Sequence, residues 1–525
     1  MMLTNFPFYI AIIVAILVII MLANKIKVAY PVLLVLAGLG ISFIPGIPAV
    51  HIEAELIFII FLPPLLYEAA WSISWKELWK WRRIITSFAF LVVLFTALSV
   101  AMVANYFIPG FSLALGFLLG GIVSPPDAVS AGAILKFVKV PRRMSSILEG
   151  ESLLNDASSL IVFRFALIAV ATGQFIWHEA ALSFVWMVVG GVGIGIMVGY
   201  FIMKFHKFLP TDTNMDIALT LITPYIIYIV AEEVHSSGVL AVVSGGLLLS
   251  NQRLSFLNSS SRLKSVNVWE SLSFILNGLV FMLIGLDLPQ IVSGLGSVSI
   301  SSAIGYGLLI TLVLVIARML SGYAAVIVTL IARNFITVAD ASHPGYKSPV
   351  LIGWSGMRGV VSLAAALSIP VQLDDGTAFP QRNLILFITF VVILTTLLLQ
   401  GLTLPWLIKK FDMPDPDYSM PEEEMYTKLR QKLSVQALEY LHANYKNELE
   451  KDMLLQQIAR KWQETGKSDN QGVVMTEEAK VVYRDVLNYQ RKWLTTINNE
   501  KNIDEEIVRK HLLFLDLEEE KLQFL

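Results

Sequence analysis

Long apolar runs separated by short polar loops fill the chain from residue 6 to residue 408. A helix of about 20 apolar residues spans a bilayer, and the hydropathy pattern with its breaker residues predicts thirteen such spans. They lie near 6–23, 28–44, 53–72, 84–107, 112–138, 146–172, 181–203, 214–232, 237–250, 270–288, 299–332, 349–371 and 383–408. The pattern therefore predicts an all-α polytopic membrane protein.

Basic residues mark alternate loops between these spans. One set of loops carries them throughout, from Lys25 and Lys27 to Arg333 and Lys347, whereas the intervening loops contain only Arg382. Because basic residues favour the cytoplasmic side, we expect the amino terminus outside the plasma (inner) membrane and the carboxyl terminus in the cytoplasm. The first apolar run has no basic residue before it and no small-residue cleavage pattern after it, which indicates a retained span rather than a signal peptide.

A polar tail follows the last span. After Lys409 and Lys410 comes a proline-punctuated linker at 413–417. Helical periodicity then predicts four helices, near 422–445, 451–465, 476–498 and 504–524. Their apolar stripes favour a core of the tail's own over a ligand site. We expect a transporter domain over 1–410 and a small cytoplasmic helical domain over 411–525, which could inhibit transport, support dimerisation or bind a regulator.

Composition narrows the function classes. Hydrophobic residues make up 56% of the chain and charged residues only 15%, and the formal net charge of −2 offers no basic surplus for nucleic acid. The absence of cysteine removes disulfides, Cys-ligated zinc and iron–sulfur sites. The sequence contains no glycine-rich phosphate loop. Nucleotide-driven transport is therefore not indicated, and we expect no cofactor and no catalytic residue of an enzyme.

One polar stretch, E-G-E-S-L-L-N-D at 149–156, lies inside the sixth predicted span. On a helix Ser152, Asn155 and Asp156 share one face about one turn apart. A charge at the bilayer centre costs at least about 2.5–3.5 kcal/mol on insertion scales, so such a residue suggests function. The alternative is a satisfied polar cluster that only joins membrane helices.

Two spans contain predicted helix breaks. Pro125 and Pro126, before Asp127, interrupt the fifth span, and this carboxylate would lie at the amino end of the second half-helix. Glycines around Arg358 interrupt the twelfth span, where a cation would complement exposed half-helix carbonyls. Spans five and twelve cross the membrane in opposite directions, which indicates an inverted repeat with a binding site between the breaks.

The remaining buried charges need partners or a cavity. Arg318 in span eleven is expected to form an interhelical ion pair with Glu151. Glu68 follows paired prolines in span three, and a carboxyl facing a neighbouring helix is as compatible with the pattern as a role in an ion pathway. Arg164, two turns beyond Asp156, could extend outward or pair inward.

In this order and on these spans, four motifs together resemble the monovalent cation/proton antiporters, in particular the sodium/proton exchanger branch. They are F-L-P-P-L-L-Y-E, S-P-P-D-A-V, G-E-S-L-L-N-D and G-M-R-G-V-V-S-L. The resemblance covers almost all of the membrane part and not the tail from about residue 412. It implies crossed broken helices in a core domain that moves against a dimerisation domain, in a homodimer surrounded by membrane lipid, with roles in sodium homeostasis and pH regulation.

The resemblance also assigns residues. Asp156 would bind the ion and carry the proton, Ser152, Asn155 and Glu68 would complete or support the site, and Asp127 would lie at the crossing. Asp156, Ser152 and Asp127 would hold the transported cation, and Glu151 with Arg318 would be the family's salt bridge. Many members have Thr-Asp-Pro where this chain has Pro126, Asp127 and Ala128, so Ser124 or backbone carbonyls would have to replace the threonine.

The expected mechanism is competition for one carboxylate. Burial raises the pKa of a carboxyl group above its ordinary value of about 3.9, and a bound cation lowers it, so proton and metal ion displace one another. The resemblance associates the Asn155–Asp156 pair with electroneutral one-for-one exchange. Hard oxygen ligands suit sodium, lithium or potassium without ranking them. An organic-anion symporter and an intramembrane aspartyl protease are the alternatives, although their usual polar cavity and their Gly-x-Gly-Asp pattern are not found here.

Overall fold

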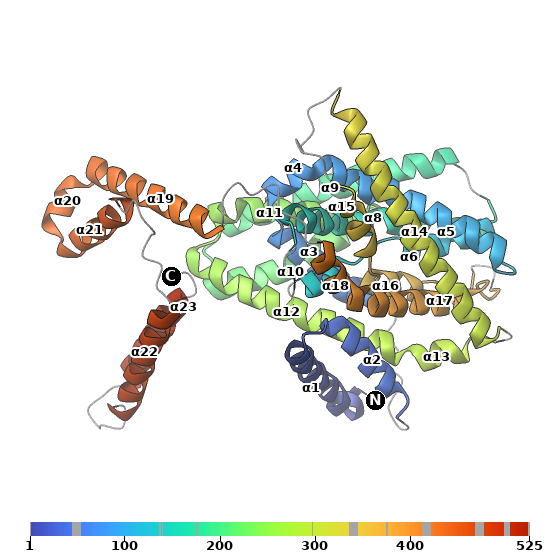
Figure 1. Ribbon diagram of the computed structural model, residues 1–525, viewed down its shortest axis with the longest axis horizontal. Coiled ribbons are helices and arrows are strands. Elements are labelled where there is room, and N and C mark those ends of the chain that lie inside the picture. Colours follow the sequence, from blue (N-terminus) through green and yellow to red (C-terminus); the bar gives the residue numbers. More distant parts are fainter. Residues whose placement is uncertain are drawn as a thin grey trace. The chain divides into compact units, whose positions relative to one another are not determined.

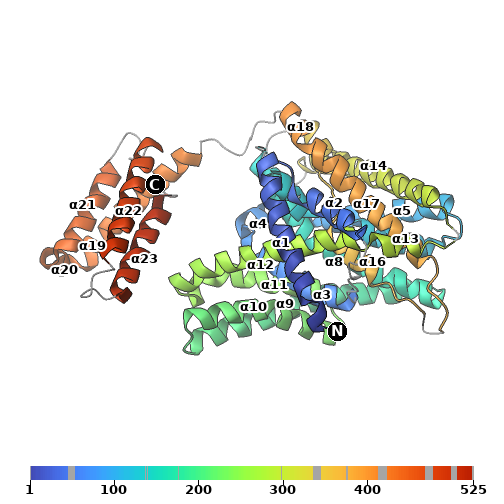
Figure 2. The same ribbon diagram turned by 90° about the horizontal axis from the view of Figure 1, so that it is seen from below.

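The fold of the chain comes from a computed structural model (Figure 1, Figure 2). It describes residues 2–44, 54–135, 138, 140–174, 177–296, 298–334, 345–373, 376–411, 422–467, 477–497 and 505–522. The chain forms two compact units, Met1–Asp417 and Tyr418–Leu525. Within the described residues the only β feature is an isolated bridge between Gln372 and Ala378, so the fold is all-α.

Each of the thirteen predicted spans coincides with a helix, with a run of consecutive helical segments, or with two helices around a break. The first half contains α1 (Met2–Ile26), α2 (Tyr30–Ser42), α3 (Ala54–Ser72), α4 (Trp75–Thr86), α5 (Val93–Phe107), α6 (Leu113–Val123), α7 (Ala128–Leu135), α8 (Arg142–Thr172) and α9 (Trp177–Phe208). The second half contains α10 (Thr213–Glu233), α11 (Gly238–Phe256), α12 (Ser259–Leu286), α13 (Leu288–Ser293), α14 (Ile300–Ala332), α15 (Lys347–Trp354), α16 (Val360–Leu367), α17 (Arg382–Thr395) and α18 (Gly401–Phe411). By length and composition, seven described helical segments can cross a membrane, and four more apolar helices are shorter.

Both predicted helix breaks are present. The fifth span stops at Val123 and resumes at Ala128, because prolines at 125 and 126 have no N–H to donate to the preceding turn. The twelfth span stops at Trp354 and resumes at Val360. Two further irregularities were not predicted. Segments with π-helical geometry, η1 (Ser87–Val92) and η2 (Thr396–Gln400), interrupt the fourth and thirteenth spans.

Small residues bring the helices around the first break into direct contact. Gly116 and Gly120 on α6 face α5, and a Cβ added at Gly120 would lie 2.6 Å from the carbonyl oxygen of Ala97. Such close backbone approach is the usual role of small residues between membrane helices. On its other side α6 packs against α8, and α5 packs against the long helix α14, which also lies beside α17 (Figure 2). The breaks are thus enclosed by helices from both halves of the chain.

The other membrane helices form two groups. Helix α11 packs against α9, α3 and α10, with an apolar cluster that includes Tyr67, Leu240 and Trp269. Helix α12 packs along α2, where Gly38 and Gly285 let the two backbones meet. A Cβ added at Gly38 would lie 2.2 Å from the carbonyl oxygen of Met282. These groups surround the broken helices without supplying the residues of the breaks.

The second unit contains the four helices predicted for the tail and one short helix, α20, that was not predicted. They are α19 (Glu422–Asn444), α20 (Lys446–Lys451), α21 (Met453–Lys467), α22 (Glu477–Ile497) and α23 (Glu505–Lys521). Helix α19 packs against α21, and α22 packs against α23 around Leu487, Leu515 and Leu522. At least α22 and α23 therefore use their apolar stripes for a core of their own. The predicted linker at 413–417 lies outside the described residues.

Candidate ion-binding site

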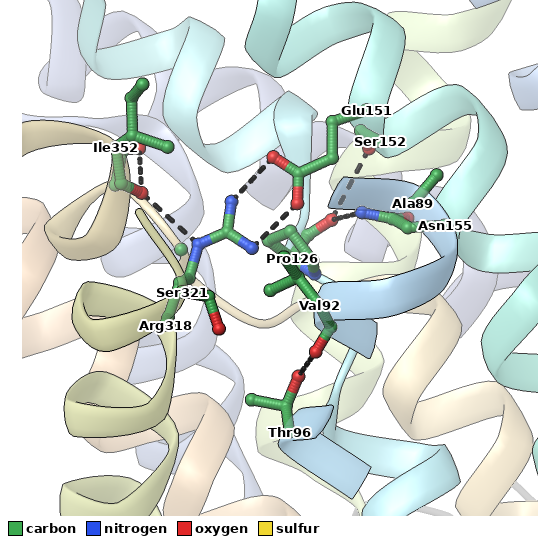
Figure 3. A network of polar contacts seen from close by, with 12 residues as sticks. Ala89, Val92, Thr96, Pro126, Glu151, Ser152, Asn155, Arg318, Ser321 and Ile352 are labelled. Carbon is green, nitrogen blue, oxygen red and sulfur yellow. Dashed lines mark hydrogen bonds and ion pairs between the residues drawn. The ribbon is translucent and has the colours of Figure 1, made fainter. Parts of the chain in front are cut away.

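Helix α8 carries the polar stretch of the sixth span. It runs for 31 residues and ends at Gly173, whose φ of 67° is the left-handed conformation that glycine adopts readily. Asn155 is fully buried and Asp156 is 8% exposed. Ser152 and Asn155 point toward the same atom, the carbonyl oxygen of Pro126 (Figure 3). The predicted sharing of one helix face therefore aims these side chains at the first break.

The first break supplies carbonyl groups that no helix satisfies. The Pro126 carbonyl accepts from Ser152 Oγ and from Asn155 Nδ2, each at 3.4 Å. Both bonds are long, which leaves room for rearrangement around this oxygen. Ser124, two residues earlier, is buried at 1% exposure, and its hydroxyl has no hydrogen-bond partner in the described part of the chain.

Asp127 caps the half-helix α7. Its Oδ1 accepts from the backbone N–H of Val129 at 2.9 Å, and its Oδ2 accepts from Ser130 Oγ at 2.5 Å. This is the expected position at the amino end of the second half-helix, where the helix dipole favours a negative charge. Both carboxylate oxygens are thus engaged. The backbone N–H of Asp127 donates to the carbonyl of Met357 at 2.8 Å, which joins the first break to the second.

Arg358 connects the second break back to the first. The side chain is 1% exposed, and its Nε donates to the carbonyl of Val123, the last residue of α6, at 2.5 Å. Its guanidinium also bonds the carbonyl of Gly356, and its backbone N–H donates to Thr396 Oγ1 of η2 at 3.2 Å. The predicted cation at exposed half-helix carbonyls is therefore present, and one of those carbonyls, that of Val123, belongs to the other broken helix.

Glu151 and Arg318 form the expected interhelical ion pair (Figure 3). The pair is bidentate, with N–O distances of 2.7 and 2.8 Å, and Arg318 Nε also donates to the carbonyl of Ile352 at 3.2 Å. Glu151 is fully buried and Arg318 is 2% exposed. Gly356 packs against the Arg318 side chain, where a Cβ would lie 2.5 Å from Cδ. The pair thus locks α8, α14 and the second break together.

Asp156 differs from its buried neighbours. In the part of the chain that the structure describes, its carboxylate accepts no hydrogen bond and forms no ion pair; only its backbone carbonyl accepts, from Ser159 Oγ at 2.9 Å. The charge of Asp127 is close enough to act on it. The Oδ1 of Asn155 is buried and likewise has no described partner. Asp156, Asn155 and Ser124 therefore present oxygens that are not used by the fold.

Glu68 lies on α3, which continues through Pro63 and Pro64 without a break. The side chain is half-buried. Tyr30, at the start of α2, lies within electrostatic range of both Glu68 and Asp127. Sequence reasoning gave Tyr30 no role, because a tyrosine at the start of an apolar run carries no distinguishing signal.

Arg164 forms an ion pair with Glu232 at the end of α10, and the two side chains are 40% and 29% exposed. The pair lies in a cavity of about 650 Å³, also lined by Leu160, Glu233 and His235. Leu160 and Arg164 follow Asp156 at four and eight residues, so this cavity extends along the helix face that carries Asp156. In the sequence, Glu232 and Glu233 at the end of the eighth span were the signal that could have indicated a partner for Arg164.

The sequence reasoning also missed a buried contact between His206 and Asp216. His206 Nδ1 lies 3.1 Å from Asp216 Oδ1, and Asp216 Oδ2 accepts from Ser261 Oγ at 2.7 Å. The three residues join α9, α10 and α12 and are each at most 4% exposed. Their positions near span ends gave them the look of loop residues in the sequence.

The comparisons with known proteins agree with this geometry. The sequence profile of the family described as sodium/hydrogen exchanger, transmembrane, matches residues 12–410. The chain belongs to the sodium/hydrogen exchanger family. It is therefore an integral membrane protein, and the resemblance in the four motifs is confirmed.

Individual members of the family are also similar to this chain in sequence. A Bacillus subtilis protein named as a sodium, potassium, lithium and rubidium/H⁺ antiporter is 37% identical over 399 residues, which are 73% of this chain and 58% of that protein. The chain thus spans less than two thirds of that relative's length. An uncharacterized Na⁺/H⁺ exchanger of Mycobacterium tuberculosis is 30% identical over 528 residues, 98% of this chain and 95% of that one. This alignment includes the tail, whereas the family profile ends at residue 410, as expected from the motifs.

The fold is also that of a solved exchanger. The sodium proton antiporter of Methanocaldococcus jannaschii superposes with a TM-score of 0.64, at 18% identity, over 78% of this chain and 99% of that one. At this identity the likeness concerns the fold alone. It supports the all-α membrane architecture.

Proposed function

We propose that this protein is a secondary antiporter that exchanges a monovalent cation for a proton by alternating access. Sodium is the first candidate, with lithium and potassium as further ones. The names of its relatives support this substrate class, since the Bacillus subtilis protein is named for sodium, potassium, lithium and rubidium. The protein would lie in the plasma membrane as a homodimer, with the amino terminus outside and the carboxyl terminus in the cytoplasm.

The charge balance at the crossing carries the proposal. Glu151 is matched by Arg318, and the two carboxylate oxygens of Asp127 accept hydrogen bonds from Val129 and Ser130. Asp156 is then the carboxylate of this set that has neither a described cation nor a described hydrogen-bond donor. A buried charge is strongly disfavoured unless it is paired. Asp156 would therefore be neutralised either by a proton or by a metal cation, which is the exclusive choice that coupled exchange requires.

The ligands for the cation would be oxygens that the fold leaves unused. Asp156 provides the charge, and Asn155 Oδ1 with Ser124 Oγ provides neutral oxygens of the kind that alkali cations prefer. Ser124 would stand in for the missing threonine. Asp127, whose two oxygens cap α7, would act through its charge, and Ser152 and Glu68 would support the site.

Transport in proteoliposomes tests the proposal. Vesicles with an acidic interior and a pH-sensitive dye inside should become alkaline when sodium, lithium or potassium is added outside. Asp156→Asn should respond like protein-free vesicles for all three ions. The control Asp485→Asn, an exposed change in α22, should keep the wild-type rate. Cation-driven alkalinisation by Asp156→Asn at the wild-type rate would refute the role of this residue, and uptake of an organic anion would support the symporter instead.

With one unmatched carboxylate, the exchange would be electroneutral. Each turnover carries one positive charge in either direction, so an imposed membrane potential should not change the rate at equal pH and cation gradients. A potential that drives net charge through the purified protein would contradict one-for-one coupling.

The second unit would modulate the pH dependence of transport. Its helices have their own packing around Leu487, Leu515 and Leu522, so it can act as a separate module. A chain truncated after Lys410 should still exchange ions but with a shifted pH profile. An unchanged profile and rate would rule out this role for residues 411–525.

A further inference from the structure

A cavity outside the ion site lies beside α4, η1, α5 and α14. It has a volume of about 920 Å³. Its lining changes character from one end to the other. Basic side chains line the end formed by α4, namely Lys80, Arg82 and Arg83, and aliphatic and aromatic side chains line much of the rest, including Leu91, Phe95 and Leu320.

Helix α4 has the composition of a segment at the membrane surface. Trp75 and Trp79 are 43% and 56% exposed and stack with their ring centres 5.9 Å apart. The guanidinium of Arg82 lies 4.5 Å from the centre of the Trp79 ring, and Lys80 Nζ lies 4.7 Å from that of Trp81. Tryptophan rings favour the interface between headgroups and hydrocarbon. Since α4 continues through η1 and α5 into the fourth span, the basic end of the cavity lies where that span begins.

The apolar part of the cavity exists because α14 presents small side chains. Ser321, Ala324 and Ala325 line it, while the exposed Leu320 and Val328 form its edges at 57% and 62% exposure. An aliphatic slot below a cationic rim is complementary to a molecule with an anionic head and a hydrocarbon chain. A free phosphate would contact only the basic rim. The apolar slot therefore favours a lipid over a free phosphate.

We propose that this cavity binds an anionic phospholipid, with its phosphate at Lys80, Arg82 and Arg83 and an acyl chain along α14. Basic pockets between membrane helices recognise such headgroups. The bound lipid contacts both the start of span four and α14, the helix that also supplies Arg318. It therefore braces the helix that holds the partner of Glu151. This site is independent of the proposed ion exchange.

Native mass spectrometry of the purified full-length protein tests the site. The probes are phosphatidylglycerol and phosphatidylcholine with identical acyl chains, added at equal concentration. We expect at least about tenfold tighter binding of phosphatidylglycerol, because each nearby basic residue contributes about 1 kcal/mol, or roughly fivefold, toward an anionic lipid surface. Equal binding of the two lipids by the wild type would overturn the proposal.

Variants locate the binding. The triple change Lys80→Gln, Arg82→Gln and Arg83→Gln should abolish the preference, whereas Lys204→Gln, Lys207→Gln and Lys264→Gln, which remove the same charge from α9 and α12, should leave it intact. Arg82→Gln alone, at an exposed position, should reduce it about fivefold and serves if the triple variant does not fold. Ala324→Trp should fill the slot and displace the lipid with the rim unchanged. A preference that survives both the rim and the slot variants would place the lipid elsewhere and refute this site.

Discussion

Two carboxylates five residues apart on α8 are treated in opposite ways by the fold. Glu151 is enclosed by a bidentate contact with Arg318, which is itself fixed by the carbonyl of Ile352. Asp156 is almost as buried, yet no described donor reaches its carboxylate. The same residue chemistry on one helix therefore serves stability at one position and is left available for binding at the other.

The difference shows how to recognise a working charge inside a membrane protein. A buried charge with good geometry on all sides holds helices together and has no capacity for a ligand. A buried carboxylate without a donor is costly to the fold. Such a residue indicates that a proton or a bound cation neutralises the carboxylate. Variants that remove each carboxylate in turn, with stability and transport measured in both, test this distinction.

The largest effect is expected for Glu151→Ala. The change leaves the buried guanidinium of Arg318 without its partner, and removal of one member of a buried pair typically costs about 3–5 kcal/mol. The free energy of unfolding in detergent should fall by that amount. The control is Glu424→Ala, which removes a half-exposed partner of Lys428 and should cost at most about 0.5 kcal/mol. Equal losses for the two variants would show that the Glu151 pair adds no special stability.

Asp156→Asn should give the reverse pattern. Exchange should drop below about one hundredth of the wild-type rate, equivalent to about 2.7 kcal/mol, because the titrating group is gone. The unfolding free energy should stay equal or rise, since an unpaired buried charge is removed. Parallel measurements of dye response and thermal unfolding check both parts. A strongly destabilised Asp156→Asn would mean that this carboxylate has a structural partner.

Gly359→Ala tests the contact between the two breaks. A Cβ at this position would lie 2.0 Å from Asp127 Oδ2, so the carboxylate would have to leave its capping position. Overpacking of this kind costs about 1–3 kcal/mol, and transport should fall with it. Gly305→Ala on α14, where nothing lies within 4 Å of the added Cβ, should be neutral or slightly stabilising. If both variants are neutral, Asp127 can move without loss.

Ser130→Ala and Ser124→Ala give the finest distinction. Ser130 donates to Asp127, so its loss should cost about 1 kcal/mol of stability. Ser124 has no described partner, so its removal should change stability by less than about 0.5 kcal/mol. It should instead raise the sodium concentration for half-maximal exchange by about tenfold, the equivalent of one hydrogen-bond-sized contact. An unaffected sodium dependence would exclude Ser124 as a ligand.

Much of the site could be predicted because its signals are local. Pro125 and Pro126 follow paired glycines and break the fifth span, although Pro63 and Pro64 leave α3 continuous. A buried Arg318 needs an acidic partner. The links between the breaks have no such signal. The bonds from Arg358 to Val123 and from Asp127 to Met357 join residues far apart in sequence. They depend on how two half-helices pass each other, which spacing along the chain does not specify.

Other features had weak or competing signals. The segments η1 and η2 contain no proline or glycine, so nothing in their sequence distinguishes a π-helical turn from an ordinary one. Two adjacent acids at the end of α10, Glu232 and Glu233, are possible partners for Arg164 in the sequence. In the structure Arg164 pairs with Glu232. His206 and Asp216 are buried by the packing of three helices, although the sequence places His206 between two predicted spans and Asp216 at the start of the next one.

The two bonds that join the breaks also set a mechanical limit. Arg358 holds the end of α6, and the N–H of Asp127 holds Met357, so each interrupted helix is fastened to the other at its weakest point. The unwound segments would therefore have to break these bonds to act as independent hinges. While both bonds hold, a displacement that carries Asp156 from one side of the membrane toward the other would move α6, α7, α8, α15 and α16 as one block. The sliding surfaces would then lie at the outer boundary of that block.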